Sequence, residues 1–161
     1  MPKVERKYLV SFVNTGTFAT PIWKLLGIGT PDNSLAFNVD KESITDVTGL
    51  TSTDIKKIEI SQAFDPVPVQ DDDDFQEEIL KNMLTNNVSE LANKDVLVVI
   101  GWNPSMAAPF DAYRYTESTI SAQSLGGDAY VSLPFTVDYG GEVMEGTVDG
   151  IRDVTFTPTV S

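Results

Sequence analysis

The residues with the clearest chemical potential are four consecutive aspartates, Asp71, Asp72, Asp73 and Asp74. Their carboxylate oxygens are the ligands that calcium and magnesium prefer, but the run lacks the alternating acidic positions, central glycine and final glutamate of an EF-hand loop. An apolar stripe starts at the next residue, and carboxylates are favoured at helix N-termini because they cap the chain and oppose the helix dipole. We therefore interpret the run as a helix start and expect no metal site.

Other reactive combinations are weak or missing. The chain has no histidine and no cysteine, which excludes serine–histidine triads, histidine-based zinc sites, thiolate catalysis and disulfides. Gly27-Ile28-Gly29 is too short for a dinucleotide-binding fingerprint. Carboxylate pairs such as Glu142 and Glu145 are expected by chance among 24 acidic residues. We predict no catalytic residues and no cofactor, and we do not expect an enzyme.

The net charge of −13 is concentrated in one part of the sequence. Residues 1–70 hold 7 basic and 8 acidic residues, a net of −1, whereas residues 71–161 hold 4 and 16, a net of −12. An acidic surface repels nucleic-acid phosphates, so conventional nucleic-acid binding is not expected. The charge is consistent with solubility alone, or with a surface that must not adhere to a polyanion.

The elements that would position any site are mostly strands. Apolar runs predict strands over Tyr8–Val13 and Val96–Ile100, the second apolar on both faces and hence central. Alternation over Ile58–Phe64 predicts a half-buried strand with both isoleucines and the phenylalanine on one face. The longest alternation, residues 130–139, predicts a long strand, and Gly140-Gly141 is typical of a hairpin turn.

One helix is predicted, at about residues 72–86. Phe75, Ile79 and Met83 lie four residues apart, and Leu80 and Leu84 widen the same stripe. We expect Asn86-Asn87 to end or interrupt it. About eight strands and one helix in 161 residues favour a single mainly β domain over residues 1–161, a sandwich or barrel with a helix covering one end.

Several segments are candidates for contact with other chains. Residues 44–53 are rich in Thr, Ser and Asp around Gly49, and we interpret them as an extended loop or the tip of a long hairpin. Unprotected strand edges invite pairing with another chain. We expect intersubunit contacts at residues 14–21, at residues 41–53 and in the C-terminal tail.

Three segments have a recognisable form and order. These are Ile22 to Thr30 ("W-x-x-x-G-x-G-T"), Asn38 to Gly49 (with "E-x-x-x-D-V-T-G" from Glu42) and Ile58 to Pro66 ("I-E-I-S-Q-A-F-D-P"). In these segments and their order, over most of residues 8–110, the chain resembles the tail tube (major tail) proteins of siphophages, which are related in fold to the type VI secretion tube protein.

The resemblance implies a structural subunit of a bacteriophage tail tube. Six subunits would form a ring, and stacked rings would enclose a DNA-conducting channel that holds a tape measure protein and transiently passing DNA. The protein would be made in the host bacterial cytoplasm, reside in the virion tail, and bind neither membranes nor specific nucleic acid. A long inter-strand loop at about residues 40–56 would reach the neighbouring ring. Its candidate contact residues are Glu42, Asp46, Thr48, Gly49, Thr51 and Thr53.

Two other functions fit the same pattern. A tail terminator or a bacteriocin-like tube would share the fold, but a terminator would stop at one ring. A carbohydrate-binding or adhesion β-sandwich would use exposed aromatic residues, such as Tyr113, Tyr115 and Tyr130, to stack on sugars. For the tube, we expect acidic residues of the C-terminal two-thirds to line a channel wall that repels DNA.

Overall fold

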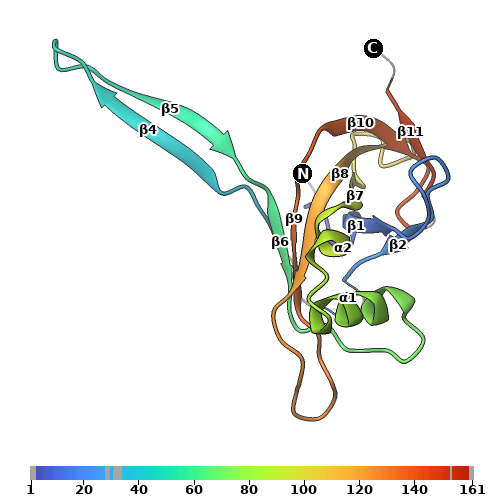
Figure 1. Ribbon diagram of the computed structural model, residues 1–161. Coiled ribbons are helices and arrows are strands. Elements are labelled where there is room, and N and C mark those ends of the chain that lie inside the picture. Colours follow the sequence, from blue (N-terminus) through green and yellow to red (C-terminus); the bar gives the residue numbers. More distant parts are fainter. Residues whose placement is uncertain (1–2, 28–29, 31–33, 153, 160–161) are drawn as a thin grey trace.

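The computed structural model describes residues 3–27, 30, 34–152 and 154–159. The chain is mainly β, as predicted, with its larger sheet curled into a half-barrel against which the helices pack (Figure 1). Positions 28 and 29, within the Gly27-Ile28-Gly29 segment, lie outside the described residues.

The strands are mostly short, and one of them is long. Their bounds are β1 Leu9–Asn14, β2 Trp23–Leu25, β3 Leu35–Ala36, β4 Val39–Thr45, β5 Thr51–Ile58, β6 Ser61–Phe64, β7 Lys94–Ile100, β8 Phe110–Ala122, β9 Phe135–Asp138, β10 Val143–Val148 and β11 Phe156–Pro158. A 3-10 turn covers Arg6–Tyr8, and the helices are α1 Asp74–Leu84 and α2 Val88–Ala92.

Strand β8 organises the sheet because it belongs to two parts of it. Within the described residues the hydrogen-bonded order is β2-β1-β7-β8-β9-β6-β3, and β10 pairs with both β8 and β11. The first half of β8 pairs with β7 and β10, while its last four residues, 119–122, pair with β9. A strand that changes partners along its length bends the sheet into a half-closed shape. The sequence pattern did not identify this strand.

Strands β9 and β10 lie end to end along the same edge of β8. Asp138 pairs with Thr119, and after four residues Val143 pairs with Tyr115. The prediction of a hairpin turn at Gly140-Gly141 is therefore wrong, and the two glycines instead form a bulge opposite Glu117. Gly141 has a φ of 79°, and a Cβ at this position would lie 2.7 Å from the Glu117 Cβ. The bulge therefore requires glycine there.

Two apolar clusters hold the domain together, one on each face of the sheet. The larger lies between the two halves of the curl and under α1, and the smaller is closed by β2 and β11. Strand β7 contributes to both, since Val96 faces the first and Leu97 and Val99 face the second, all fully buried. The prediction that Val96–Ile100 forms a central strand is confirmed.

The predicted helix is present but shorter than expected. Phe75 and Ile79 are buried, whereas Met83 and Leu84 are exposed, so the apolar stripe is correct only for the first two turns. Asn86 adopts a positive φ of 57° after the helix ends, and α2 begins two residues later. The predicted interruption at Asn86-Asn87 is therefore confirmed.

Two predicted strands are wrong in extent. Residues 58–64 form no continuous strand, because β5 ends at Ile58, whose side chain is 55% exposed, and β6 begins at Ser61. The chain re-enters the domain at this point from the β4–β5 hairpin, so Ile58, at the base of the hairpin, faces solvent. The expected long strand over residues 130–139 is reduced to β9, since Ser132 makes only isolated bridges.

Candidate functional site

The β4–β5 hairpin projects far from the rest of the domain (Figure 1). Every residue of both strands is exposed. Isolated two-stranded hairpins are at best marginally stable in water. This hairpin nevertheless carries exposed apolar side chains along its length, namely Val39, Ile44, Ile55 and Ile58. The hairpin is therefore not stabilised by burial against the rest of the domain.

The tip of the hairpin is a defined turn. Asp46 accepts hydrogen bonds through Oδ1 from the Thr48 and Leu50 amides, at 2.8 and 3.1 Å, and from the Thr48 hydroxyl at 2.5 Å. These bonds hold the pKa of Asp46 below its ordinary value. Gly49 supplies the positive φ of 84° that the turn needs. As a result Val47, fully exposed, and Leu50, 71% exposed, are presented outward.

The six residues expected to make contact all belong to this hairpin. Asp46, Thr48 and Gly49 build the tip, whereas Thr51 and Thr53 begin β5. The two β5 threonines hydrogen-bond across the strands through their hydroxyls, to Thr45 at 3.0 Å and to Ser43 at 3.2 Å. Glu42 lies directly opposite Asp54. The predicted residues thus share one structural unit, formed mainly by the tip-proximal half of the hairpin.

The loop between β1 and β2, residues 15–22, is held in place by a buried ion pair. Arg114 donates from Nε to both carboxylate oxygens of Asp95, at 2.9 and 3.1 Å, and also from Nη2 to that carboxylate. The same Nη2 donates to the Phe18 carbonyl at 3.1 Å, and the guanidinium stacks on the rings of Phe18 and Trp23. The loop is therefore anchored by a side chain 96 residues away.

Asn14 completes this anchor. Its Oδ1 accepts from the backbone amides of Gly16 and Ile22, and its Nδ2 donates to Asp95 at 2.9 Å. Sequence reasoning missed Arg114 and Asp95. The available signal was a lone arginine at an inward position of an alternating strand, two residues after Ala112. Such a position requires a buried acidic partner.

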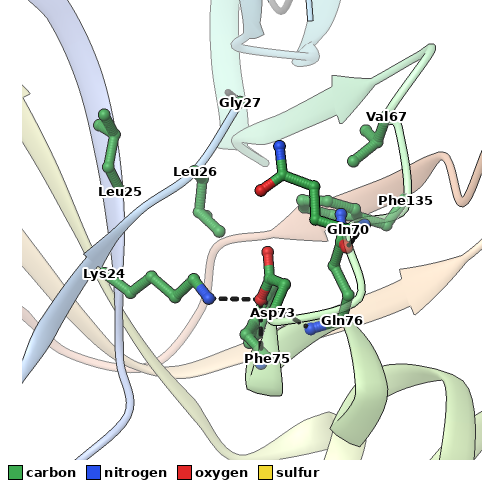
Figure 2. A pocket seen from close by; sticks show the side chains of 10 residues that line it. All are labelled: Lys24, Leu25, Leu26, Gly27, Val67, Gln70, Asp73, Phe75, Gln76 and Phe135. Atoms are coloured by element: carbon green, nitrogen blue, oxygen red, sulfur yellow. Dashed lines mark hydrogen bonds and ion pairs between the residues drawn. The ribbon is translucent and has the colours of Figure 1, made fainter. Parts of the chain in front are cut away.

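The helix-start aspartates divide into one structural residue and three surface residues. Asp73 is the N-cap of α1 and accepts from the amides of Phe75 and Gln76, at 3.1 and 3.2 Å, while it pairs with Lys24 from β2 (Figure 2). The other three carboxylates are exposed: Asp71, Asp72 and Asp74. The cavity beside Lys24 and Asp73 measures about 30 Å³, far below the size of ligand pockets.

A polar network crosses the larger core. The Gln62 Oε1 accepts from the Ser11 hydroxyl at 2.8 Å and from the Tyr139 hydroxyl at 2.7 Å, and burial raises the pKa of Tyr139. Gln62 occupies the inward position between Ile60 and Phe64, where the sequence offered no apolar residue. The network joins β1, β6 and the segment after β9.

The tyrosines considered for sugar stacking do not form one platform. Tyr113 and Tyr115 are half-buried in β8, and Tyr115 packs on Tyr139 with ring centroids 5.0 Å apart. Tyr130 is exposed in the loop before β9 and lines an open hollow next to Asp128. On the face of the sheet that carries Tyr113, the exposed carboxylates of Asp111 and Glu145 flank the β8–β10 pair.

The described residues hold no group of three or more acidic side chains close enough to ligate a metal ion. None of the helices formed by those residues is long and apolar enough to cross a membrane.

Comparison with known proteins identifies the fold. No family model and no curated protein matches the chain. Among solved structures, the chain is similar to the anti-feeding prophage tube-terminating cap, with a TM-score of 0.53 at 14% identity, over 91% of this chain and 93% of the other. It is also similar to a chain of the PVC sheath–tube complex of an extracellular contractile injection system. The TM-score is 0.53 at 8% identity, over 91% of this chain and 93% of the other.

A third similar structure is the sheath/tube terminator of the same PVC system, with a TM-score of 0.51 at 10% identity over 90% of this chain and 97% of the other. At such identities the likeness establishes the fold alone. The chain has a tail-tube-like fold. No comparison confirms the expected membership of the siphophage major tail proteins.

Proposed function

We propose that this protein is a structural subunit of a bacteriophage tail tube, and that six copies form a ring that stacks with others around a DNA-conducting channel. The observation that carries the proposal is the solvent-exposed β4–β5 hairpin, on a fold similar to a tube-terminating cap and to a chain of a sheath–tube complex. Such a hairpin gains stability from a neighbouring copy. The closed channel would contain the tape measure protein and passing DNA, and the protein would act without catalysis.

The charge distribution supports the same role. Asp111 and Glu145 share an exposed face of the sheet, within the part of the sequence that carries a net charge of −12. A ring that turned this face inward would present carboxylates to DNA, and phosphates would pass without binding. An electrostatic map of an assembled ring with a positive channel would contradict this part of the proposal.

Negative-stain microscopy and mass photometry of the purified protein, over a range of concentrations, test the proposal. Six copies of the 17.6 kDa chain give a ring of about 106 kDa, and stacked rings give tubes. A protein that remains monomeric at every concentration, even when the rest of its tail machinery is supplied, or that forms only two-fold dimers, would refute it.

A second candidate is a tube-terminating cap, which is favoured by the similarity to two terminator proteins. A cap closes one ring and exposes no surface for the next one. Rings of about 106 kDa that never stack, even at high concentration, would favour the cap over the tube. A glycan-binding module predicts a monomer that binds sugars on a glycan array.

A further inference from the structure

The charges of the hairpin are unevenly distributed along its length. Residues 42–54, which include the tip, hold Glu42, Asp46 and Asp54 and no lysine or arginine. The half next to the domain holds Asp40 together with three lysines, at positions 41, 56 and 57. The part that extends furthest from the domain therefore carries a net charge of −3 and two outward apolar residues at its tip.

Glu42 and Asp54 lie directly opposite each other across the hairpin. Like charges at this position destabilise a two-stranded sheet. Lys56 is 3.7 Å from Glu42, but both side chains remain about half exposed, so this cation compensates only part of the repulsion. A second cation, supplied from outside the chain, would remove it.

One surface of the domain offers such cations. Lys3, Arg6 and Lys7 lie in the exposed N-terminal segment, where Arg6 also donates from Nη1 to the Leu9 carbonyl at 2.6 Å. Arg152 is near this segment, because the preceding residue, Ile151, and Tyr8 both lie against Gly101. The four basic residues, with Glu5 beside Lys7, give a net charge of +3 in a chain whose total is −13. Val4, 48% exposed, lies among them. We define these residues, 3–7 and 152, as the basic patch.

We propose that the distal half of the hairpin of one copy docks on the basic patch of a neighbouring copy. The Glu42–Asp54 pair would receive cations from the patch, and Val47 and Leu50 would cover Val4. The two surfaces are different parts of the same chain, so the contact is heterologous and propagates from copy to copy. This inference rests on the proposed function, because it names the partner of the hairpin in the assembly.

A charge exchange tests the docking. In the first variant, Glu42→Lys and Asp54→Lys reverse the charge of the distal half of the hairpin. In the second, Lys3→Glu and Arg152→Glu reverse two charges of the basic patch. Each variant is expected to raise the concentration needed for assembly by about tenfold or more at low salt, because like charges then face each other. The variant that carries all four changes is expected to assemble nearly as the parent does.

Controls separate this contact from general charge effects and from misfolding. Glu77→Lys with Glu90→Lys changes the net charge by the same amount as the hairpin variant, but on the exposed helix surface. This control is expected to leave assembly largely unaltered. Asp54→Asn removes the repulsion between Asp54 and Glu42. The hairpin of the unassembled protein should therefore remain at least as ordered by NMR, and assembly should still be weakened. At 1 M salt the differences between variants should shrink, since charges are then screened over about 3 Å.

The outcomes distinguish two failures. If the parent assembles and the reversed variants assemble equally well, or if the fourfold variant does not recover, the docking is wrong while the proposed function stands. If the parent itself never forms rings, the proposed function fails.

Discussion

Removing the Asp95 carboxylate should destabilise the protein strongly, because it leaves the buried Arg114 cation without its anionic partner. The Arg114 side chain is 6% exposed and that of Asp95 is 14% exposed. Removing one partner of a buried ion pair typically costs about 3–5 kcal/mol. Arg114 keeps the Phe18 carbonyl and two stacked rings, so we expect Asp95→Ala to cost about 3 kcal/mol, at the lower end of that range.

Urea denaturation followed by circular dichroism measures this cost. With a slope of about 2 kcal/mol per molar urea, typical for small domains, the midpoint should fall by about 1.5 M. The Lys57–Glu59 pair provides a matched control, since its N–O distance is 2.9 Å but both side chains are mostly exposed. Lys57→Ala should leave the midpoint nearly unchanged.

The double variant Asp95→Leu/Arg114→Met separates the cost of a buried charge without a partner from the cost of the lost contacts. It replaces both ions by apolar side chains and should recover most of the stability that Asp95→Ala loses, because no charge remains buried. A loss below about 1 kcal/mol for Asp95→Ala, or a double variant less stable than the single one, would refute the reasoning.

Three further predictions concern single positions. Asp73→Ala should lower stability by about 1 kcal/mol through loss of the N-cap, while Asp72→Ala, at an exposed neighbour, should not shift the urea midpoint. Gly141→Ala should cost about 1–3 kcal/mol from backbone strain and the clash with Glu117; Gly126→Ala, with no atom within 4 Å of the added methyl, is its thermal-melt control. Because the pKa of Asp46 is lowered in the folded tip, the order of the tip should be complete above its usual value of 3.8 and lost as pH falls below it. Amide chemical shifts of Thr48 and Leu50 would report this loss, and Asp46→Asn should abolish the pH dependence.

The sequence predicted those elements whose apolar pattern follows directly from which of their own residues are buried. The apolar run at Val96–Ile100 became the central strand, and the aspartates before Phe75 became a capped helix start. Composition could not indicate which of four consecutive aspartates caps the helix. That choice depends on Lys24, which approaches from a strand 49 residues away.

The errors share a cause, which is the influence of distant segments on local pattern. Strand β8 has an arginine and a serine among its inward residues, so its alternation is interrupted by polar groups that find partners only in the folded chain. Ile58 has the pattern of a core residue but is the last residue of the projecting hairpin and faces solvent. Gly140-Gly141 has the composition of a turn, yet β8 continues past it and converts it into a bulge.

Charged residues have different surroundings at the Arg114 anchor and on the hairpin. In the core, the Asp95 and Arg114 charges are buried and fully paired within one chain, and they fix the loop of residues 15–22 in a single position. On the hairpin, Glu42 and Asp54 repel each other in the isolated chain. A chain with a net charge of −13 also repels its own copies over several ångströms. Association of such copies therefore requires local contacts of opposite sign, such as the contact we propose between the acidic distal half of the hairpin and the basic patch.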